Sequence, residues 1–368
     1  SRMARHPSFR YWIVATSHLL RVRSGLEVFD GGMVADGPST ALLILHLRDL
    51  HRFGIAARIM AAEEFRDTLV PVHAGPLVFP GTGIALSGIQ AQVSVDLKAT
   101  RGQNGDIALT VEQTGACLHL DPACSAISPT AGNLRRLPMP RIPVVGQAGL
   151  EIDVWDPYFR NVWVGQEVFS GGIRAPLALE NELEEWTMVM HEAMAWLKLA
   201  QGELHDEIGH FIQSVVPIRS LDRSKSLSVS APEFPGAIQC SLDPAPMMGE
   251  VLVHEYRHNL LHAITTLDPV LAPSSPTGDR FYSPWRDDPR PLHGILHAIF
   301  SFLGVVLYYR GLLERASLSP TNQRAARRRT TAHAKRLEFA AEQIKMALFT
   351  DFGEGFIDGL LRGVTQST

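Results

Sequence analysis

The chain has 368 residues, of which 45% are hydrophobic and 20% are charged, and its formal net charge is −4 at pH 7. This composition excludes a disordered chain, and the length allows two or three domains or one large one. A small negative charge gives no electrostatic footprint for nucleic acid, so we expect no nucleic-acid partner. Cys117, Cys124 and Cys240 are too few for a disulfide scaffold, which favours a reducing, cytoplasmic setting.

Two segments bear on whether a membrane is expected. Residues 1–23 contain arginines and only short apolar runs, which is not the pattern of a signal peptide. Residues 295–313 are strongly apolar, but His297 and Arg310 limit the uninterrupted apolar run to residues 299–309. That length suits a buried core helix better than a membrane span, so we expect no membrane partner.

The N-terminal half predicts helices followed by a β-rich region. Apolar spacing predicts helices over residues 9–20 and 41–62, which the glycine-rich residues 30–32 separate. Between residues 75 and 126 the segments alternate or are β-rich, with Gly and Asn between them. We expect antiparallel strands and hairpins there, over residues 76–79, 89–95 and 107–111. The proline-rich residues 129–146 are expected to form a connector.

The C-terminal half predicts mainly helices, over residues 179–198, 204–215, 251–261, 292–313 and most of 320–361. Two short strands, residues 226–230 and 236–242, precede the third of these helices. A long proline-rich loop, residues 268–292, follows it, and loops of this length are usually functional or disordered. We therefore expect an α+β fold with a β-rich N-terminal half and a mainly helical C-terminal half. Residues 1–175 would be a mixed region that docks a peptide, and residues 176–368 the catalytic region.

The most informative motif is an H-E-x-x-H sequence inside an apolar run with helical spacing. Residues i and i+4 share one face of a helix, so His254 and His258 can place two imidazoles on one metal ion. Glu255 lies about 100° around the helix from His254, where it can act on a bound water but cannot be a third ligand. A solvated helix with two incidental histidines would not have apolar neighbours on both sides. The motif therefore predicts a metal site.

A third ligand must come from elsewhere in the chain. His262 lies about 12 Å along the helix axis from His254, which is too far to share one ion comfortably. His293 and His297 open the next predicted helix, also four residues apart. We favour His297 as the ligand because its neighbours are apolar, and we expect His293, beside the loop, to contact substrate.

The loop before that helix offers further polar and aromatic groups. A carboxylate from Asp287 or Asp288 is the alternative third ligand, and it would give the two-histidine, one-carboxylate pattern of non-haem iron. Arg286 and Arg290 can each hold a carboxylate through paired hydrogen bonds, or can pair with acids of the loop itself. The two aromatic residues of this loop that we expect to contact substrate are Tyr282 and Trp285.

Residues 253–261 and 282–298 resemble the two signature blocks of the H-E-x-x-H peptide-modification family. Those proteins act in the biosynthesis of ribosomally made, post-translationally modified peptides, and are regarded as Fe(II)- and 2-oxoglutarate-dependent enzymes that hydroxylate a β-carbon of a precursor-peptide residue. The resemblance spans residues 176–313. It implies Fe(II) and 2-oxoglutarate as cofactors and a precursor peptide as substrate. The residues to which it gives roles are His254, His258 and His297 on the metal, Arg286 or Arg290 on the co-substrate carboxylate, and Glu255 orienting a ligand or a water.

A zinc metallopeptidase is the alternative, because imidazole binds zinc as well as iron. In that case Glu255 is the general base, and the predicted strand over residues 236–242 aligns the peptide. The second signature block and its arginines favour the hydroxylase. A metal-free peptide-binding protein is a third hypothesis, and it predicts no tightly bound metal.

Overall fold

The computed structural model describes residues 3–23, 38–72, 75–101, 107–113, 116–120, 135–137, 139–144, 149–156, 180–219, 226–276 and 281–367. The chain divides into two compact units: Ser1–Arg141 with Glu151–Leu183, and Ile142–Leu150 with Glu184–Thr368. Sheets lie in the N-terminal half and helices dominate the C-terminal half, which confirms the predicted α+β fold. Three features of the sequence lie outside the described residues: residues 30–32, Cys124 and the expected boundary at residues 175 and 176.

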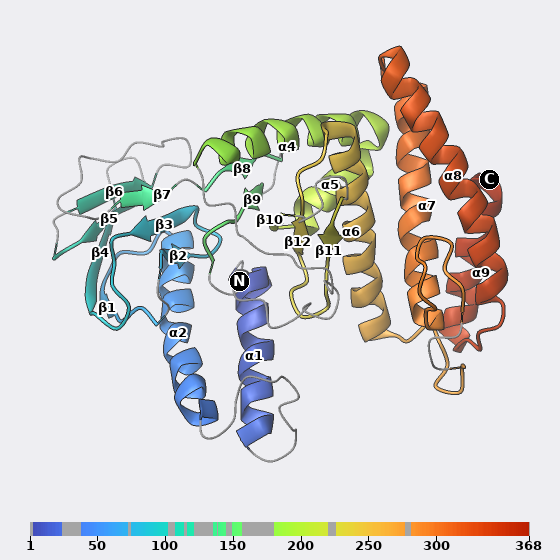
Figure 1. The fold of residues 1–368 in the computed structure, drawn as a ribbon. Helices are drawn as coiled ribbons and strands as arrows, with labels where there is room; N and C mark the ends of the chain where they lie inside the picture. Colours follow the sequence, from blue (N-terminus) through green and yellow to red (C-terminus); the bar gives the residue numbers. More distant parts are fainter. Residues whose placement is uncertain are drawn as a thin grey trace. The chain divides into compact units, whose positions relative to one another are not determined.

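The described part of the N-terminal unit has helices followed by antiparallel sheets (Figure 1). Its helices are η1 (Met3–Arg5), α1 (Pro7–Arg23) and α2 (Pro38–Met60). One sheet has the strand order β1 (Phe65–Leu69), β4 (Val95–Arg101), β5 (Ile107–Val111) and β6 (Ala116–Leu120). The other has the order β2 (Leu77–Phe79), β3 (Ile84–Ser87) and β7 (Arg135–Leu137).

Side-chain alternation sets the register of the larger sheet. On β4, Leu97 and Ala99 are buried while Lys98 between them is exposed. Leu97 lies opposite Val111 of β5, and Ala99 lies opposite Leu109, so the apolar faces of the two strands coincide. Complete burial of a leucine side chain contributes about 2 kcal/mol, and a slip of one residue would turn these side chains to water.

Two predictions for this unit need correction. Residues 89–94 form turns and a bend rather than a strand, and β4 begins only at Val95. Gln92 has φ 63°, a left-handed conformation that a strand does not contain, and its N–H donates to the carbonyl of Pro71. The expected connector over residues 129–146 contains β7 and part of the boundary between the units. Strand β7 pairs with β3, a long-range contact that proline spacing does not reveal.

The described part of the C-terminal unit carries a small sheet and long helices (Figure 1). The helices are α4 (Glu180–Ala200), α5 (Gly202–Phe211), α6 (Ala245–Leu267), α7 (Leu292–Arg315), α8 (Pro320–Ile344) and α9 (Asp351–Ser367). The strands are β10 (Ser214–Pro217), β11 (Ser228–Val229) and β12 (Ala237–Cys240). The sheet order is β11, β12, β10, then β9 (Leu150–Ile152) and β8 (Arg141–Ile142), the two strands through which the boundary between the units passes.

The helix predicted over residues 204–215 ends early. Helix α5 stops at Phe211, and Ser214–Pro217 forms β10, which pairs in parallel with β12. All four residues of β10 are buried. Two consecutive valines followed by a proline fit a short buried strand. These residues form a strand rather than a helix because they pair with β12, which lies more than 20 residues further along the chain.

Helix α7 is the central apolar helix of this unit and packs against α6, α8 and α9. Its length and composition alone would allow it to cross a membrane, but 61% of its most apolar window is buried inside the structure. Glycines let its neighbours approach closely. A Cβ on Gly249 of α6 would lie 2.2 Å from the Tyr308 hydroxyl, and one on Gly304 would lie 3.1 Å from the Arg257 side chain. A larger residue would overlap Tyr308 at position 249 and would press on the Arg257 side chain at position 304, so both glycines let α6 and α7 lie close together.

Candidate metal centre

His254 and His258 lie one turn apart on α6, as the motif predicts. Their Nε2 atoms are 3.0 Å apart, and the rings meet edge to face with centroids 4.6 Å apart. Two nitrogen ligands at about 2.1 Å from one ion, separated by about 90–110°, lie about 3.0–3.4 Å from each other. The pair therefore has the spacing of two neighbouring ligands of a single metal ion.

Burial keeps these imidazoles in the form that binds metals. Loss of hydration lowers the pKa of His254 to about 4 and that of His258 to about 3, and the nearby His254 contributes to the second shift. His297 on α7 is lowered in the same way to a pKa of about 2, by burial first and then by the neighbouring histidines. All three are neutral at pH 7, and a neutral imidazole has the lone pair that a metal ion requires.

His297 meets His258 from the other side. Its Nδ1 lies 3.0 Å from His258 Nδ1, whereas the Nε2 of the same His258 ring faces His254. His258 therefore turns a different ring nitrogen toward each neighbour. In this ring orientation, no single nitrogen of His258 points at a metal position that His254 and His297 could share. Among the described residues, no group of three His, Cys, Asp or Glu side chains has the arrangement that a metal ion needs. The structure brings the three predicted histidines together, and two of them have the spacing of ligands on one ion.

The histidine cluster is longer than the motif. The rings of His262 and His297 have centroids 4.4 Å apart, and the charges of His262 and His293 both influence His297. His262 is too far from His254 along α6 to share one ion with it comfortably, but α7 places His297 beside His262. The signal in the sequence was the repeat of histidines at i, i+4 and i+8, which forms one continuous stripe on a helix.

Glu255 is buried and engaged by two serines. The hydroxyls of Ser228 and Ser230 donate to its two carboxylate oxygens, each at 2.6 Å. One turn later, Asn259 accepts from the N–H of Gly236 and donates to the carbonyl of Ala237. Glu255 and Asn259 thus fasten β11 and the start of β12 to α6. The carboxylate still acts electrostatically on His258, in the direction that favours its charged form.

An aromatic group that the sequence did not indicate covers one side of His254. Phe302 of α7 lies with its ring centroid 4.6 Å from that of His254, and Trp285 stacks on Phe302 at 4.5 Å with an interplanar angle of 2°. His333 of α8 stacks on Phe302 and accepts a hydrogen bond from the Trp285 indole. Of the loop aromatics that we expect to contact substrate, Trp285 therefore lies next to the histidine cluster.

A largely buried carboxylate, that of Glu250, lies one turn before His254. Glu250 accepts hydrogen bonds of 2.6 Å from the Tyr309 hydroxyl and from Arg329, and His333 lies 3.7 Å away. Burial alone would raise its pKa, but His333, Arg329 and Tyr309 together lower it. Glu250 in turn favours the charged form of His254. Helical spacing on α6 places Glu250 one turn from His254. The partners of Glu250 lie on α7 and α8, so the sequence of α6 does not reveal them.

The remaining predicted residues lie on the surface of the loop. Arg286 and Arg290 both form ion pairs with Asp288, at 2.9 and 3.1 Å. Tyr282 is 58% exposed and packs edge to face on Phe339. Asp288 is exposed, and ion pairs in water contribute little to stability, so either arginine can exchange this partner for another anion at little cost.

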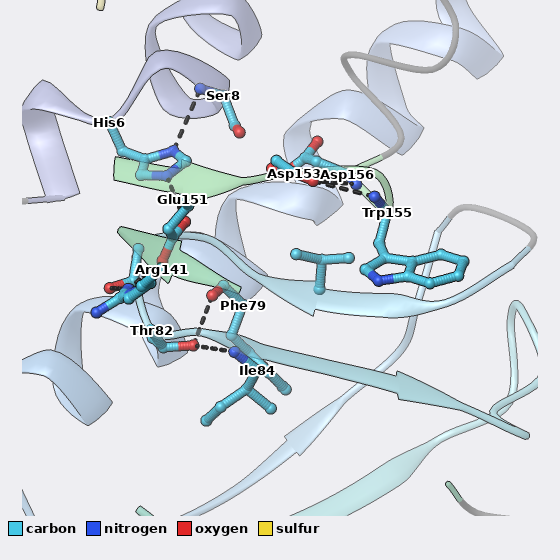
Figure 2. Close-up of polar contacts among 12 residues, drawn as sticks. His6, Ser8, Phe79, Thr82, Ile84, Arg141, Glu151, Asp153, Trp155 and Asp156 are labelled. Carbon is cyan, nitrogen blue, oxygen red and sulfur yellow. Dashed lines mark hydrogen bonds and ion pairs between the residues drawn. The ribbon is translucent and has the colours of Figure 1, made fainter. Parts of the chain in front are cut away.

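The N-terminal unit contains a second buried polar cluster (Figure 2). Glu151 pairs with Arg141 and with His6, and although burial alone would raise its pKa, these partners lower it to about 2. Asp153 accepts from the backbone N–H groups of Trp155 and Asp156 through one oxygen. Its pKa is raised, first by burial and then by the charge of Asp156.

We expect Asp153→Asn to remove a pH dependence of stability. A raised pKa means that folded Asp153 retains a proton that the unfolded chain releases, so the wild type loses stability as pH rises above about 4. The amide cannot ionise and keeps the oxygen that accepts both backbone N–H groups. The advantage of Asp153→Asn over the wild type should grow by about 1 kcal/mol per pH unit between pH 5 and 7. Urea unfolding at each pH measures it, with Asp96→Asn on the half-exposed side of β4 as the control. An advantage that does not change with pH would contradict the assignment.

No model of a known protein family matches the chain, and no curated protein sequence matches it. The chemistry of the histidine cluster must therefore be judged from its own side chains.

Proposed function

We propose that this chain is an Fe(II)- and 2-oxoglutarate-dependent enzyme that hydroxylates a residue of a ribosomally made precursor peptide. The observation that carries the proposal is the pair of neutral, partly buried imidazoles of His254 and His258, with Nε2 atoms 3.0 Å apart, and His297 at the same distance from His258. His254 and His258 would hold the metal, with His297 as the third ligand. Bound iron, with 2-oxoglutarate and O₂, would supply the oxidising power needed to hydroxylate an unactivated carbon.

The surrounding residues fit a site that must exclude water and align a peptide. Phe302 and Trp285 form an apolar wall beside His254. In the sheet order of the described strands, β11 stands at the end, so one of its edges can accept an extended peptide through main-chain hydrogen bonds. Glu255 holds β11 against α6 through Ser228 and Ser230. Strand β11, where the peptide would dock, and the two motif histidines His254 and His258 are thereby attached to the same helix.

The co-substrate carboxylate would bind to Arg286 or Arg290. Each guanidinium would leave Asp288, an exchange that exposed ion pairs permit. We also propose a cytoplasmic location, because precursor peptides are made there and the described cysteines, Cys117 and Cys240, are free thiols.

Glu255 distinguishes this proposal from a zinc metallopeptidase. A general base needs a carboxylate oxygen that can take a proton from the attacking water. Both oxygens of Glu255 instead accept hydrogen bonds from serine hydroxyls, which suits a group that positions neighbouring elements. We expect Glu255→Gln to retain a measurable part of a hydroxylase activity, because the amide can still bond to both serines. Loss of nearly all activity in a folded Glu255→Gln protein, measured as turnover of the same peptide, would favour the peptidase.

The proposal is tested by anaerobic reconstitution of the full chain with Fe(II), followed by 2-oxoglutarate. We expect a weak visible charge-transfer band that appears only when both are present. Candidate precursor peptides would then gain the mass of one oxygen in the presence of O₂. A chain that shows no band, binds zinc tightly and cleaves peptides would overturn the proposal.

A further inference from the structure

A separate cavity of about 710 Å³ lies in the C-terminal unit, where α4 ends and α5 begins. None of the clustered histidines lines it. Its basic side chains are Lys198, Arg257 and Arg315, and its acidic ones are Glu203 and Glu207. The lining therefore carries one positive charge more than negative, and it favours a ligand with a single negative charge over a polyanion.

Arg257 is the unusual member of this lining. Its guanidinium lies 5.0 Å from the centroid of the Phe300 ring, and its stem passes over Gly304 of α7. Its Nε is buried and has no hydrogen-bond partner among the described residues. Glu207 of α5 acts electrostatically on Arg257, but it already accepts a hydrogen bond from the Tyr256 hydroxyl at 3.0 Å. The Arg257 side chain lines the cavity and forms no ion pair with an acid among the described residues, so an anion in the cavity would give its charge a partner.

The start of α5 adds donors to the same cavity. Gly202, Glu203 and Leu204 are its first three residues, and all three line the cavity. The N-cap residue Gln201 makes no side-chain cap hydrogen bond, so these first N–H groups are not satisfied by a cap. Arg315 is already engaged, because it donates to the carbonyl of Ala200 at the end of α4. Lys198 and Arg257 are therefore the two cations available to a ligand.

We propose that this cavity binds a ligand through one oxyanion, a carboxylate or a phosphate, held between Arg257 and Lys198 with the first N–H groups of α5. A guanidinium offers paired donors to either anion, and a helix start favours negative charge. The proposal does not depend on the hydroxylase chemistry.

Titration of the full chain with inorganic phosphate and, separately, with acetate at constant ionic strength tests this site. Binding is followed by isothermal titration calorimetry. We expect saturable binding of at least one anion, weakened about 10-fold or more by Arg257→Gln and several-fold by Lys198→Gln. Lys198 is exposed, so its variant keeps the test valid if Arg257→Gln folds poorly. Lys335→Gln, an exposed position on α8, is the matched control and should bind as the wild type does.

The two anions separate the possible ligands. Tighter binding of phosphate assigns the site to a phosphate ester, and tighter binding of acetate assigns it to a carboxylate. Absence of saturation by either anion below about 100 mM would overturn the proposal, as would equal affinities in the wild type and in both cavity variants.

Discussion

Replacing His258 with alanine is expected to abolish stoichiometric iron binding. His258 is the only one of the three predicted ligands that contacts both others, His254 through Nε2 and His297 through Nδ1. The two imidazoles that would remain, those of His254 and His297, each contact His258 and not each other. Loss of an outer partner of a ligand alone weakens a metal site by about 10- to 100-fold, so loss of this central ligand should cost about 100-fold or more. Metal content after anaerobic reconstitution and desalting measures the effect.

Two further ligand variants and one control variant are compared with His258→Ala. His254→Ala and His297→Ala should also lose metal, whereas His191→Ala, an exposed position on α4, should bind as the wild type does. Circular dichroism of each variant checks that the helices remain. Retention of iron by folded His258→Ala would contradict the site, and retention by His297→Ala alone would remove His297 from the ligand set. His262, whose ring lies against that of His297, would then be the next position to replace.

Replacing Gly311 with alanine should destabilise the C-terminal unit more than most single substitutions. The added Cβ would lie 2.3 Å from the carbonyl oxygen of Ala200 and 2.9 Å from its carbon. These are backbone atoms at the end of α4, so no side chain can turn aside and α7 itself must shift. Overpacking usually costs about 1–3 kcal/mol, and a backbone clash belongs at or above the upper end of that range. The free energy of unfolding in urea measures the loss.

Gly355 provides a matched control in the same unit. It lies within α9, and a Cβ built on it meets nothing within 4 Å. Gly355→Ala should therefore leave the packing unchanged and stabilise its helix by up to about 1 kcal/mol, because alanine has the higher helix propensity. Equal stabilities of the Gly311→Ala and Gly355→Ala proteins would show that α7 and α4 can separate without cost.

Local geometry explains which parts of the fold and of the site the sequence could predict. The pairing of His254 with His258 follows from the helical repeat alone, and β5 was predicted at residues 107–111 from alternation alone. The strand predicted over residues 89–95 was wrong up to residue 94, because Gln92 adopts a left-handed conformation that composition does not reveal. The sequence predicted helix where β10 lies, because the strand forms only through its pairing with β12.

The rest of the site depends on contacts between distant helices. Phe302 and His333 lie on α7 and α8, and nothing in their immediate sequence marks them as neighbours of His254. For Arg286 and Arg290 the sequence left two partners open, a co-substrate carboxylate or an acid of the loop itself, and in the structure both pair with Asp288. A carboxylate two residues from each arginine is a competitor that the sequence already contained.

The glycine contacts of α7 have a consequence for how this protein tolerates random mutation. Gly249 and Gly304 lie where α6 meets α7, and Gly311 lies where α7 meets the end of α4. A Cβ would overlap other atoms at Gly249 and Gly311, at 2.2 and 2.3 Å, and would make a tight contact of 3.1 Å at Gly304. In a library covering every substitution, Gly249 and Gly311 should be among the most depleted positions of the C-terminal unit. Much of the information that holds the histidine-bearing helices in place is thus encoded by residues without side chains.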